Sequence, residues 1–231
     1  MPKTHLLIGG NSGIGFALAR ILHGQGDVVH AAARNPGELA DLGIPVQSFD
    51  ARNPATLAVP EPLDGLVYLP GSITLKPFHR LTREDFLNDL EINLLGAVAA
   101  IQQALPALKA APSASVVLFS TVAVAQGMPF HASIAAAKAA VEGLVRSLAA
   151  EFAPKIRVNA IAPSLTDTAL ASPLVNNDAK REAAAKRHPL QRIGAADDAA
   201  SLAAWLLSDA SSFMTGQILR PDGGLSSVRT F

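Results

Sequence analysis

The chain has 231 residues, of which 49% are hydrophobic and 16% are charged, with 19 basic and 19 acidic residues. This composition provides enough apolar material for a buried core and argues against disorder. Because the formal net charge is zero and no basic run occurs, we expect no nucleic-acid partner and no binding to an anionic membrane. The absence of cysteine excludes disulfides, thiol catalysis and thiolate metal sites.

The N-terminus leads directly into an apolar strand pattern and lacks the layout of a secretory signal. No uninterrupted apolar run reaches the roughly eighteen residues that a membrane helix needs. The six histidines are scattered and do not have the spacing of metal ligands. We therefore expect a soluble cytoplasmic protein without a metal site.

Short apolar runs alternate with longer helical patterns along the whole chain. In chain order we expect strand HLLIGG, helix GFALARILHGQG, strands DVVHAAAR, IPVQSFD and LDGLVYLPG, a helix over about 83–108 capped by Thr82, strand ASVVLFST, a helix over 132–152, strand KIRVNAIAPS, helix DDAASLAAWLLSD and strand QILRPDGG. Continuous apolar strands separated by helices predict one α/β domain spanning 1–231. Its parallel sheet of about seven strands has helices on both faces.

The first expected strand ends in the glycine-rich stretch GGNSGIG, and a helical pattern follows at once. The glycines are Gly9, Gly10, Gly13 and Gly15, with the spacing G-x-x-x-G-x-G. Glycine permits a tight turn and lets the backbone approach a pyrophosphate, and a helix N-terminus attracts the phosphate charge. Such a cluster can also be a tight turn without a ligand. Its place at the first strand–helix junction of a parallel sheet favours a nucleotide site.

Several segments of the chain, in order, resemble the short-chain dehydrogenase/reductase family over essentially the whole length. They are the glycine loop, EINLLG, the stretch HASIAAAKAAVEG, RVNAIAPSLTDT, LQRIGAADDAASLAAWLLSD and TGQILRPDGG. The resemblance implies a Rossmann-type doubly wound domain that binds a nicotinamide cofactor. It also implies reversible hydride transfer between that cofactor and a carbonyl or alcohol substrate.

The resemblance assigns a set of residues to the cofactor. The set is Gly9, Asn11, Ser12, Gly13, Ile14, Gly15, Arg34, Asp50, Ala51, Gly71, Asn93, Lys138, Pro163, Thr166 and Thr168. Within it, Asp50 matches an aspartate that contacts adenine, and Lys138 matches the lysine that holds the nicotinamide ribose. Pro163 is followed by serine where the family usually has glycine.

The residue after the second expected strand distinguishes the two nicotinamide dinucleotides. An acidic side chain there binds the ribose 2′-hydroxyl of NAD, whereas an arginine pairs with the 2′-phosphate of NADP. Ala33 occupies the acidic position and Arg34 follows it. This pair favours NADP(H) over NAD(H), although Arg34 can also be only a solvated loop residue.

The catalytic set implied by the resemblance is incomplete. Asn93 and Lys138 match two of its members, and Thr121 stands in the place of a serine that helps to hold the substrate oxygen. The family's proton-donating tyrosine lies four residues before the lysine, and this chain has Ile134 there. Shifting the register by a residue or two brings no tyrosine to the position. The single tyrosine, Tyr68, is expected to pack in the core.

Three hypotheses follow from the isoleucine. The first is an oxidoreductase whose proton comes from His131, Thr121 or a bound water. His131 lies three residues before Ile134, and histidine is a residue type suited to proton transfer. An exposed or capping role is the other interpretation of His131. The second hypothesis is a cofactor-binding protein without turnover, acting as a sensor or partner subunit. The third is a different reaction on the same scaffold.

By resemblance, residues 164–193 should form a substrate flap within the domain. Its first part is apolar and a polar stretch follows; the apolar residues include Leu165, Leu170, Leu174 and Val175. The family also forms subunit contacts with its two long central helices, which implies a homodimer or homotetramer. The helix around Lys138 is rich in small side chains that allow close helix packing, namely Ala132, Ala135, Ala136, Ala137, Ala139 and Ala140.

Overall fold

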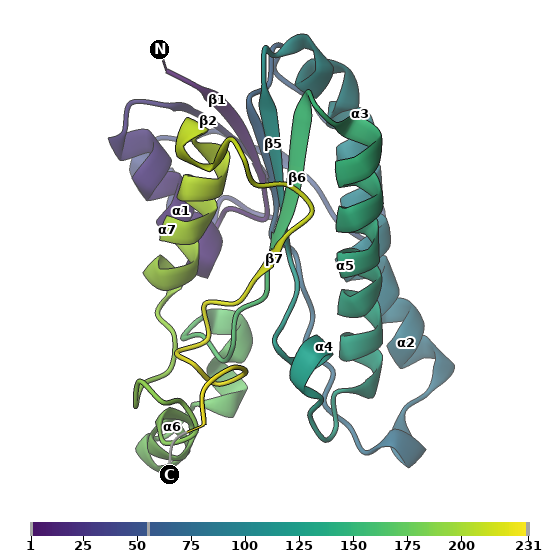
Figure 1. The fold of residues 1–231 in the computed structure, drawn as a ribbon, viewed down its shortest axis with the longest axis vertical. Helices are drawn as coiled ribbons and strands as arrows, with labels where there is room; N and C mark the ends of the chain where they lie inside the picture. Colours follow the sequence, from purple (N-terminus) through teal and green to yellow (C-terminus); the bar gives the residue numbers. More distant parts are fainter. Residues whose placement is uncertain (1, 55, 230–231) are drawn as a thin grey trace.

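The computed structural model, which describes residues 2–54 and 56–229, contains a seven-stranded sheet in the order β3-β2-β1-β4-β5-β6-β7 (Figure 1). Every neighbouring pair is parallel. The strands are β1 (Thr4–Ile8), β2 (Val28–Ala33), β3 (Val46–Ser48), β4 (Gly65–Tyr68), β5 (Ala114–Phe119), β6 (Ile156–Ile161) and β7 (Ile218–Leu219). The predicted single doubly wound sheet is confirmed.

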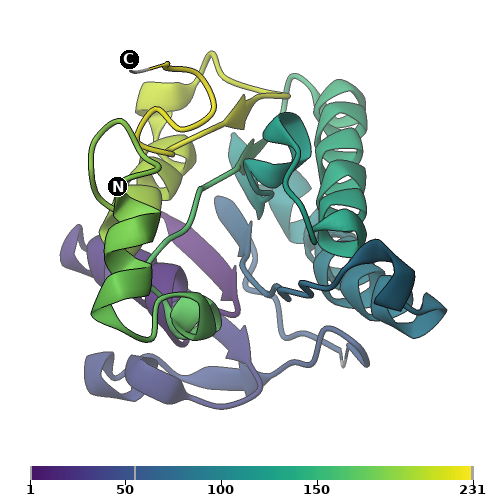
Figure 2. The same ribbon diagram turned by 90° about the horizontal axis from the view of Figure 1, so that it is seen from below.

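Helices cover both faces of the sheet (Figures 1 and 2). One face carries α1 (Gly13–Gly24) and α7 (Ala196–Leu207), and the other carries α3 (Gly96–Ala110) and α5 (Ala132–Phe152). The shorter helices are α2 (Arg83–Leu90), α4 (Ala123–Gln126) and α6 (Asp178–Ala185). Two buried apolar clusters fill the spaces between the sheet and these layers, so the sheet has a core on each side. No helix in the described ranges is both long and apolar enough to cross a membrane.

The strand register brings the carboxyl ends of the strands to one edge of the sheet. Ile8, at the end of β1, pairs with Ala32 of β2 and with Tyr68 of β4, while Phe119 pairs with Ile161. The strand order reverses between β1 and β4. In such sheets, ligands bind outside the carboxyl ends of the strands, beside the point where the order reverses.

The helix predicted over about 83–108 is confirmed as a continuous helical stretch over 83–110, but a π-helical turn within it was not predicted. Thr82 does cap α2: its hydroxyl accepts a hydrogen bond from the Asp85 N–H at 3.3 Å. Residues 91–95 then form a π-helical turn before α3 begins. The Tyr68 hydroxyl donates to the Ile92 carbonyl at 2.6 Å, so one carbonyl of this turn is satisfied from the sheet. Single π-helical turns of this kind often lie at functional sites.

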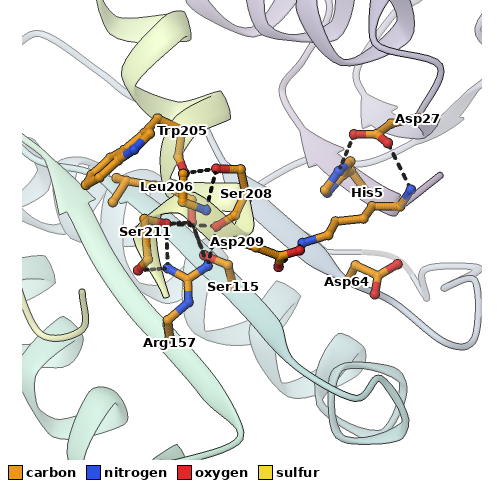
Figure 3. Close-up of polar contacts among 12 residues, drawn as sticks. His5, Asp27, Asp64, Ser115, Arg157, Trp205, Leu206, Ser208, Asp209 and Ser211 are labelled. Atoms are coloured by element: carbon orange, nitrogen blue, oxygen red, sulfur yellow. Dashed lines mark hydrogen bonds and ion pairs between the residues drawn. The ribbon is translucent and has the colours of Figure 1, made fainter. Parts of the chain in front are cut away.

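Arg157 lies near the start of β6, at the amino edge of the sheet, which is the edge where the parallel strands begin (Figure 3). Its Nη2 donates to the Leu206 carbonyl at 2.9 Å and the Ser208 carbonyl at 3.2 Å, at the end of α7. Its Nη1 donates to the Ser211 hydroxyl at 2.9 Å and carbonyl at 3.1 Å. One guanidinium thus joins the end of α7 to the turn after it, and it shares the Leu206 and Ser208 carbonyls with the Ser211 hydroxyl.

His5 lies at the same edge, on β1, and is buried (Figure 3). Its Nε2 is 3.1 Å from a carboxylate oxygen of Asp27, whose other oxygen accepts from the Lys3 N–H at 2.9 Å. Burial lowers the pKa of His5, and the Asp27 hydrogen bond acts against that shift. The amino edge is therefore occupied by structural polar contacts, whereas the residues predicted to bind cofactor gather at the carboxyl edge.

Candidate cofactor and catalytic site

The loop between β1 and α1 has a backbone that requires glycine. Gly9 and Gly13 have φ values of 78° and 52°, which side-chain-bearing residues rarely adopt. A Cβ atom on Gly15 would lie 2.7 Å from the Cα of Gly10, so the loop closes tightly against itself. The loop also holds Asn11, Ser12 and Ile14, the remaining residues predicted for it. The glycines are therefore required by the close packing of the loop against its neighbours.

The N-terminus of α1 is suited to an anion. Ser12 precedes the helix and makes no side-chain hydrogen bond to it, and the first turn contains no acidic residue. A cavity of about 450 Å³ opens beside this turn, lined in part by Ser12, Gly13 and Thr168. Since the free N–H groups of a helix N-terminus attract negative charge, these residues fit the pyrophosphate of a dinucleotide.

Three predicted residues follow β2 and β3. Arg34 is exposed directly after Ala33, and its side chain makes no hydrogen bond or ion pair within the described residues. Asp50 is half-buried and accepts a hydrogen bond from the Arg52 N–H at 2.9 Å. Ala51 packs beside Gly96, where an added Cβ would come within 2.9 Å of the alanine side chain. These residues lie at the edge where the adenosine half of a dinucleotide would extend from the loop.

Lys138 is buried on α5, and its ammonium points to the carboxyl end of β5. The Nζ atom donates to the Phe119 carbonyl at 2.8 Å. Burial lowers the pKa of Lys138 to about 8, and the charge of Asp89 acts against that shift. An ammonium has three protons to donate. With a single hydrogen-bond partner in the described structure, Lys138 has donors to spare for a ligand.

Asn93 lies on the π-helical turn and is also buried. Its Nδ2 donates to the Ser72 hydroxyl at 2.8 Å and to the Asp89 carbonyl at 2.7 Å, while its Oδ1 has no partner among the described residues. Gly71 lies close to the polar ends of both side chains: a Cβ atom added to Gly71 would be 3.4 Å from Asn93 Oδ1 and 3.7 Å from Lys138 Nζ. The structure therefore brings together three residues that are distant in sequence, with polar groups to spare.

The three other residues of the predicted catalytic set lie after β5 and at the start of α5. Thr121 follows β5, and its hydroxyl oxygen accepts from the Ala123 N–H at 3.3 Å. Ile134 is buried on α5, one turn before Lys138. His131 is half-exposed at the start of α5, and its Nδ1 lies 2.8 Å from the Pro129 carbonyl. The histidine ring thus bonds within its own loop.

Tyr68 is not available as a proton donor. Its side chain is buried, its hydroxyl donates to the Ile92 carbonyl, and burial raises its pKa. The absence of a side chain at Gly96 leaves space for the Tyr68 hydroxyl. A Cβ atom added to Gly96 would lie 2.2 Å from the tyrosine oxygen, which is too close. The structure gives Tyr68 a packing role.

The segment 164–193, predicted to form the flap, contains a 3-10 helix over Ala169–Leu174 followed by α6. It begins beside β6, where the Pro163 carbonyl accepts from the Val122 N–H. Thr166 pairs with Gly194 in an isolated bridge that closes the base of the segment.

Sequence reasoning missed a buried pair that fastens this segment. The Ser164 hydroxyl lies 2.9 Å from His188 Nε2, and the other ring nitrogen of His188 lies 2.9 Å from the Ala184 carbonyl. The one signal in the sequence was the serine that follows Pro163. That signal did not point to His188.

Sequence reasoning also missed Asp89, which is fully buried. One of its carboxylate oxygens accepts from the hydroxyls of Ser72 at 2.5 Å and Thr74 at 3.0 Å. The available signal was its position four residues before Asn93 on the same helical face. A charged residue in a polar helical stretch is usually exposed, so this signal was weak.

Comparisons with known proteins agree with this geometry. The sequence model of the family described as Enoyl-(Acyl carrier protein) reductase matches residues 8–226. A cis-4-hydroxycyclohexanecarboxylate dehydrogenase of Sinomonas cyclohexanicum is 36% identical over 98% of this chain and 97% of its own. A tropinone reductase homolog of Arabidopsis thaliana is 32% identical over 97% of this chain and 91% of its own.

Solved structures match over nearly the full length as well. A short-chain type dehydrogenase/reductase from Mycobacterium ulcerans is 29% identical, with a TM-score of 0.90 over 98% of this chain and 90% of that chain. A protein of Agrobacterium tumefaciens solved with bound NADP is 31% identical, with a TM-score of 0.89 over 98% of this chain and 97% of that chain. The chain belongs to the short-chain dehydrogenase/reductase family of oxidoreductases.

Proposed function

We propose that this protein is an NADP(H)-dependent oxidoreductase that interconverts a carbonyl compound and its alcohol, using a proton donor other than tyrosine. The observation that carries the proposal is the meeting of Gly71, Asn93 and Lys138 at the carboxyl edge, with unused polar atoms. When bound, the cofactor supplies or accepts the hydride, and the protein contributes positioning and electrostatics.

Each group of residues has a defined task in this proposal. The glycine loop and the N-terminus of α1 bind the pyrophosphate through backbone N–H groups. Lys138 uses its free donors on the nicotinamide ribose, and Thr121 has a hydroxyl proton with which to hold a substrate oxygen. The segment 164–193 forms a flap that limits access of water to the reacting atoms.

Preference for the phosphorylated cofactor rests on Ala33 and Arg34. The exposed guanidinium, without an internal partner, can pair with a 2′-phosphate, and no carboxylate at position 33 repels that phosphate. An Ala33→Asp substitution is expected to weaken NADPH binding at least tenfold and to improve NADH binding, measured by fluorescence titration of both cofactors. Arg34→Ala should weaken NADPH binding without improving NADH binding. An unchanged preference in Ala33→Asp would contradict the assignment.

The proposed activity is tested by incubating the protein with NADPH and a panel of ketones and aldehydes while following nicotinamide absorbance. Turnover above the protein-free rate is the expected result. Among the earlier candidates for the proton source, a His131→Ala variant tests the histidine directly. Tight NADPH binding without turnover on any member of the panel would favour the alternative of a cofactor-binding sensor or partner subunit.

Assembly into a homodimer or homotetramer is part of the proposal. The side of α5 that faces away from the sheet has several small exposed residues, which are Ala132, Ala136, Ala139 and Gly143. Small side chains of this kind let a helix of a second copy approach closely.

A further inference from the structure

The buried carboxylate of Asp89 is incompletely satisfied. Its Oδ1 accepts from Ser72 and Thr74, whereas its Oδ2 is buried without a hydrogen-bond partner in the described structure. A buried carboxylate normally has its hydrogen bonds satisfied, because burial of an unsatisfied charge is costly. One oxygen of the Asp89 carboxylate is therefore left with unused capacity to accept a hydrogen bond in the described structure.

Most of the unsatisfied groups lie on α5, which carries Lys138, or on the helical segments packed against it. Within the described ranges, four buried side-chain atoms lack a partner, and three of them belong to Asp89, Asn93 and Ser133. These residues lie on α2, on the π-helical turn that follows it and at the start of α5, three segments that pack together. Lys138, on α5, has donors to spare, so this corner combines free donors with free acceptors.

The charge facing Lys138 from the neighbouring helix is that of Asp89. On α5 itself, the buried Glu142 lies four residues after Lys138, but its carboxylate accepts from the Ser120 hydroxyl at 2.8 Å. Burial favours the neutral amine, and the Asp89 carboxylate favours the ammonium. The opposition of these two effects leaves Lys138 able to exchange a proton near neutral pH.

On these grounds we propose that Lys138 exchanges the proton with the substrate oxygen, and that Asp89 is the positioning residue that keeps Lys138 charged. The inference rests on the proposed function and identifies its proton donor. Ile134, one helical turn earlier on the same face, has no proton to give. His131 is held by the Pro129 carbonyl in its own loop, and a threonine hydroxyl does not ionise near neutral pH.

The proton transfer is balanced as follows. In reduction, an N–H bond of the Lys138 ammonium breaks and an O–H bond forms on the substrate oxygen. The bonding electron pair stays on nitrogen, and both electrons for the carbonyl carbon arrive with the hydride that the proposed function already requires. The resulting amine regains a proton from solvent. In alcohol oxidation the neutral amine takes the proton instead.

The pH dependence follows with a definite sign. Because the pKa of Lys138 is lowered to about 8, the ammonium predominates below that pH and the amine above it. Carbonyl reduction should therefore slow as pH rises through about 8, and alcohol oxidation should accelerate over the same interval. Removing the Asp89 charge should move both transitions to lower pH, since a carboxylate favours the charged lysine.

The first experiment needs no cofactor. The side-chain nitrogen of Lys138 is titrated by NMR in the free protein, with the Lys138→Arg variant identifying its signal by absence. Asp89→Asn, which keeps the shape and removes the charge, is expected to move the titration to lower pH. The matched control is Glu91→Gln, because Glu91 is an exposed carboxylate on the adjoining turn, and this variant should leave the titration in place. An unmoved titration in Asp89→Asn would overturn the role of Asp89.

The second experiment measures rates. Arginine does not deprotonate in proteins, so Lys138→Arg, measured at saturating NADPH, should lose about a hundred-fold or more in reduction rate and lose the transition near pH 8. This variant also keeps the proposal testable if Asp89→Asn does not fold. Wild-type-like rates and pH profile in Lys138→Arg would overturn the donor role alone. Absence of turnover in the wild-type protein would overturn the donor role together with the proposed function.

Discussion

Replacing Ile134 with tyrosine is expected to raise kcat for carbonyl reduction by about a hundred-fold, the lower end of the usual contribution of a well-placed general acid, because Lys138 already supplies a proton in the native site. Residues four apart on a helix lie on the same face, so the new phenol would lie beside Lys138. The lysine charge would then lower the phenol pKa toward neutrality. Rates are measured with NADPH and any ketone or aldehyde that the wild-type protein reduces.

The matched control for this substitution is Ile134→Phe. Ile134 is 4% exposed, so either aromatic ring must displace neighbouring atoms at a cost of about 1–3 kcal/mol in the free energy of unfolding. Urea denaturation should show a similar cost for both variants, which leaves the hydroxyl as the difference between them. If the tyrosine and phenylalanine variants have equal rates, the isoleucine position is not where the proton is delivered.

Much of the fold could be predicted because its elements are defined by local patterns. The strands β5 and β6 are buried along their whole length, so they appear in the sequence as continuous apolar runs. Helix α5 has the bounds expected from its periodicity, 132–152. The site could then be placed because parallel strands end at one edge, and Gly9, Gly71 and Thr121 each follow a strand closely.

The π-helical turn at residues 91–95 could not be predicted in the same way. The sequence there continues a helical pattern, and a carbonyl of the turn accepts a hydrogen bond from Tyr68, more than twenty residues earlier. The burial of Asp89 has a similar origin. Its hydroxyl partners Ser72 and Thr74 come from the loop after β4, and only the folded chain brings that loop against α2.

The contacts of Arg157 also depend on the folded chain, and they lead to the second large expected effect. An Arg157→Met substitution should lower the free energy of unfolding by roughly 3 kcal/mol, because several hydrogen bonds from a buried charged donor are lost at once, although the accepting carbonyls keep other donors. Methionine retains much of the apolar length of arginine, so the loss reports mainly on the hydrogen bonds made with Leu206, Ser208 and Ser211. In a chain of this size the thermal midpoint should fall by roughly 10 °C.

Two further variants separate this effect from a general effect of charge. Arg187 is exposed on the segment after α6, and Arg187→Met should leave the thermal midpoint close to that of the wild type. Arg157→Lys keeps the charge but replaces the guanidinium, whose two Nη nitrogens bond to the end of α7 and to the turn after it, with a single ammonium. This variant should therefore recover only part of the free energy of unfolding that Arg157→Met loses. Full recovery by lysine would mean that charge alone matters. Arg157 lies at the amino edge of the sheet, opposite the cofactor site. The variants that fold should therefore bind NADPH as tightly as the wild type does. A titration with NADPH then shows that the substitution changes the stability of the protein and not its cofactor site.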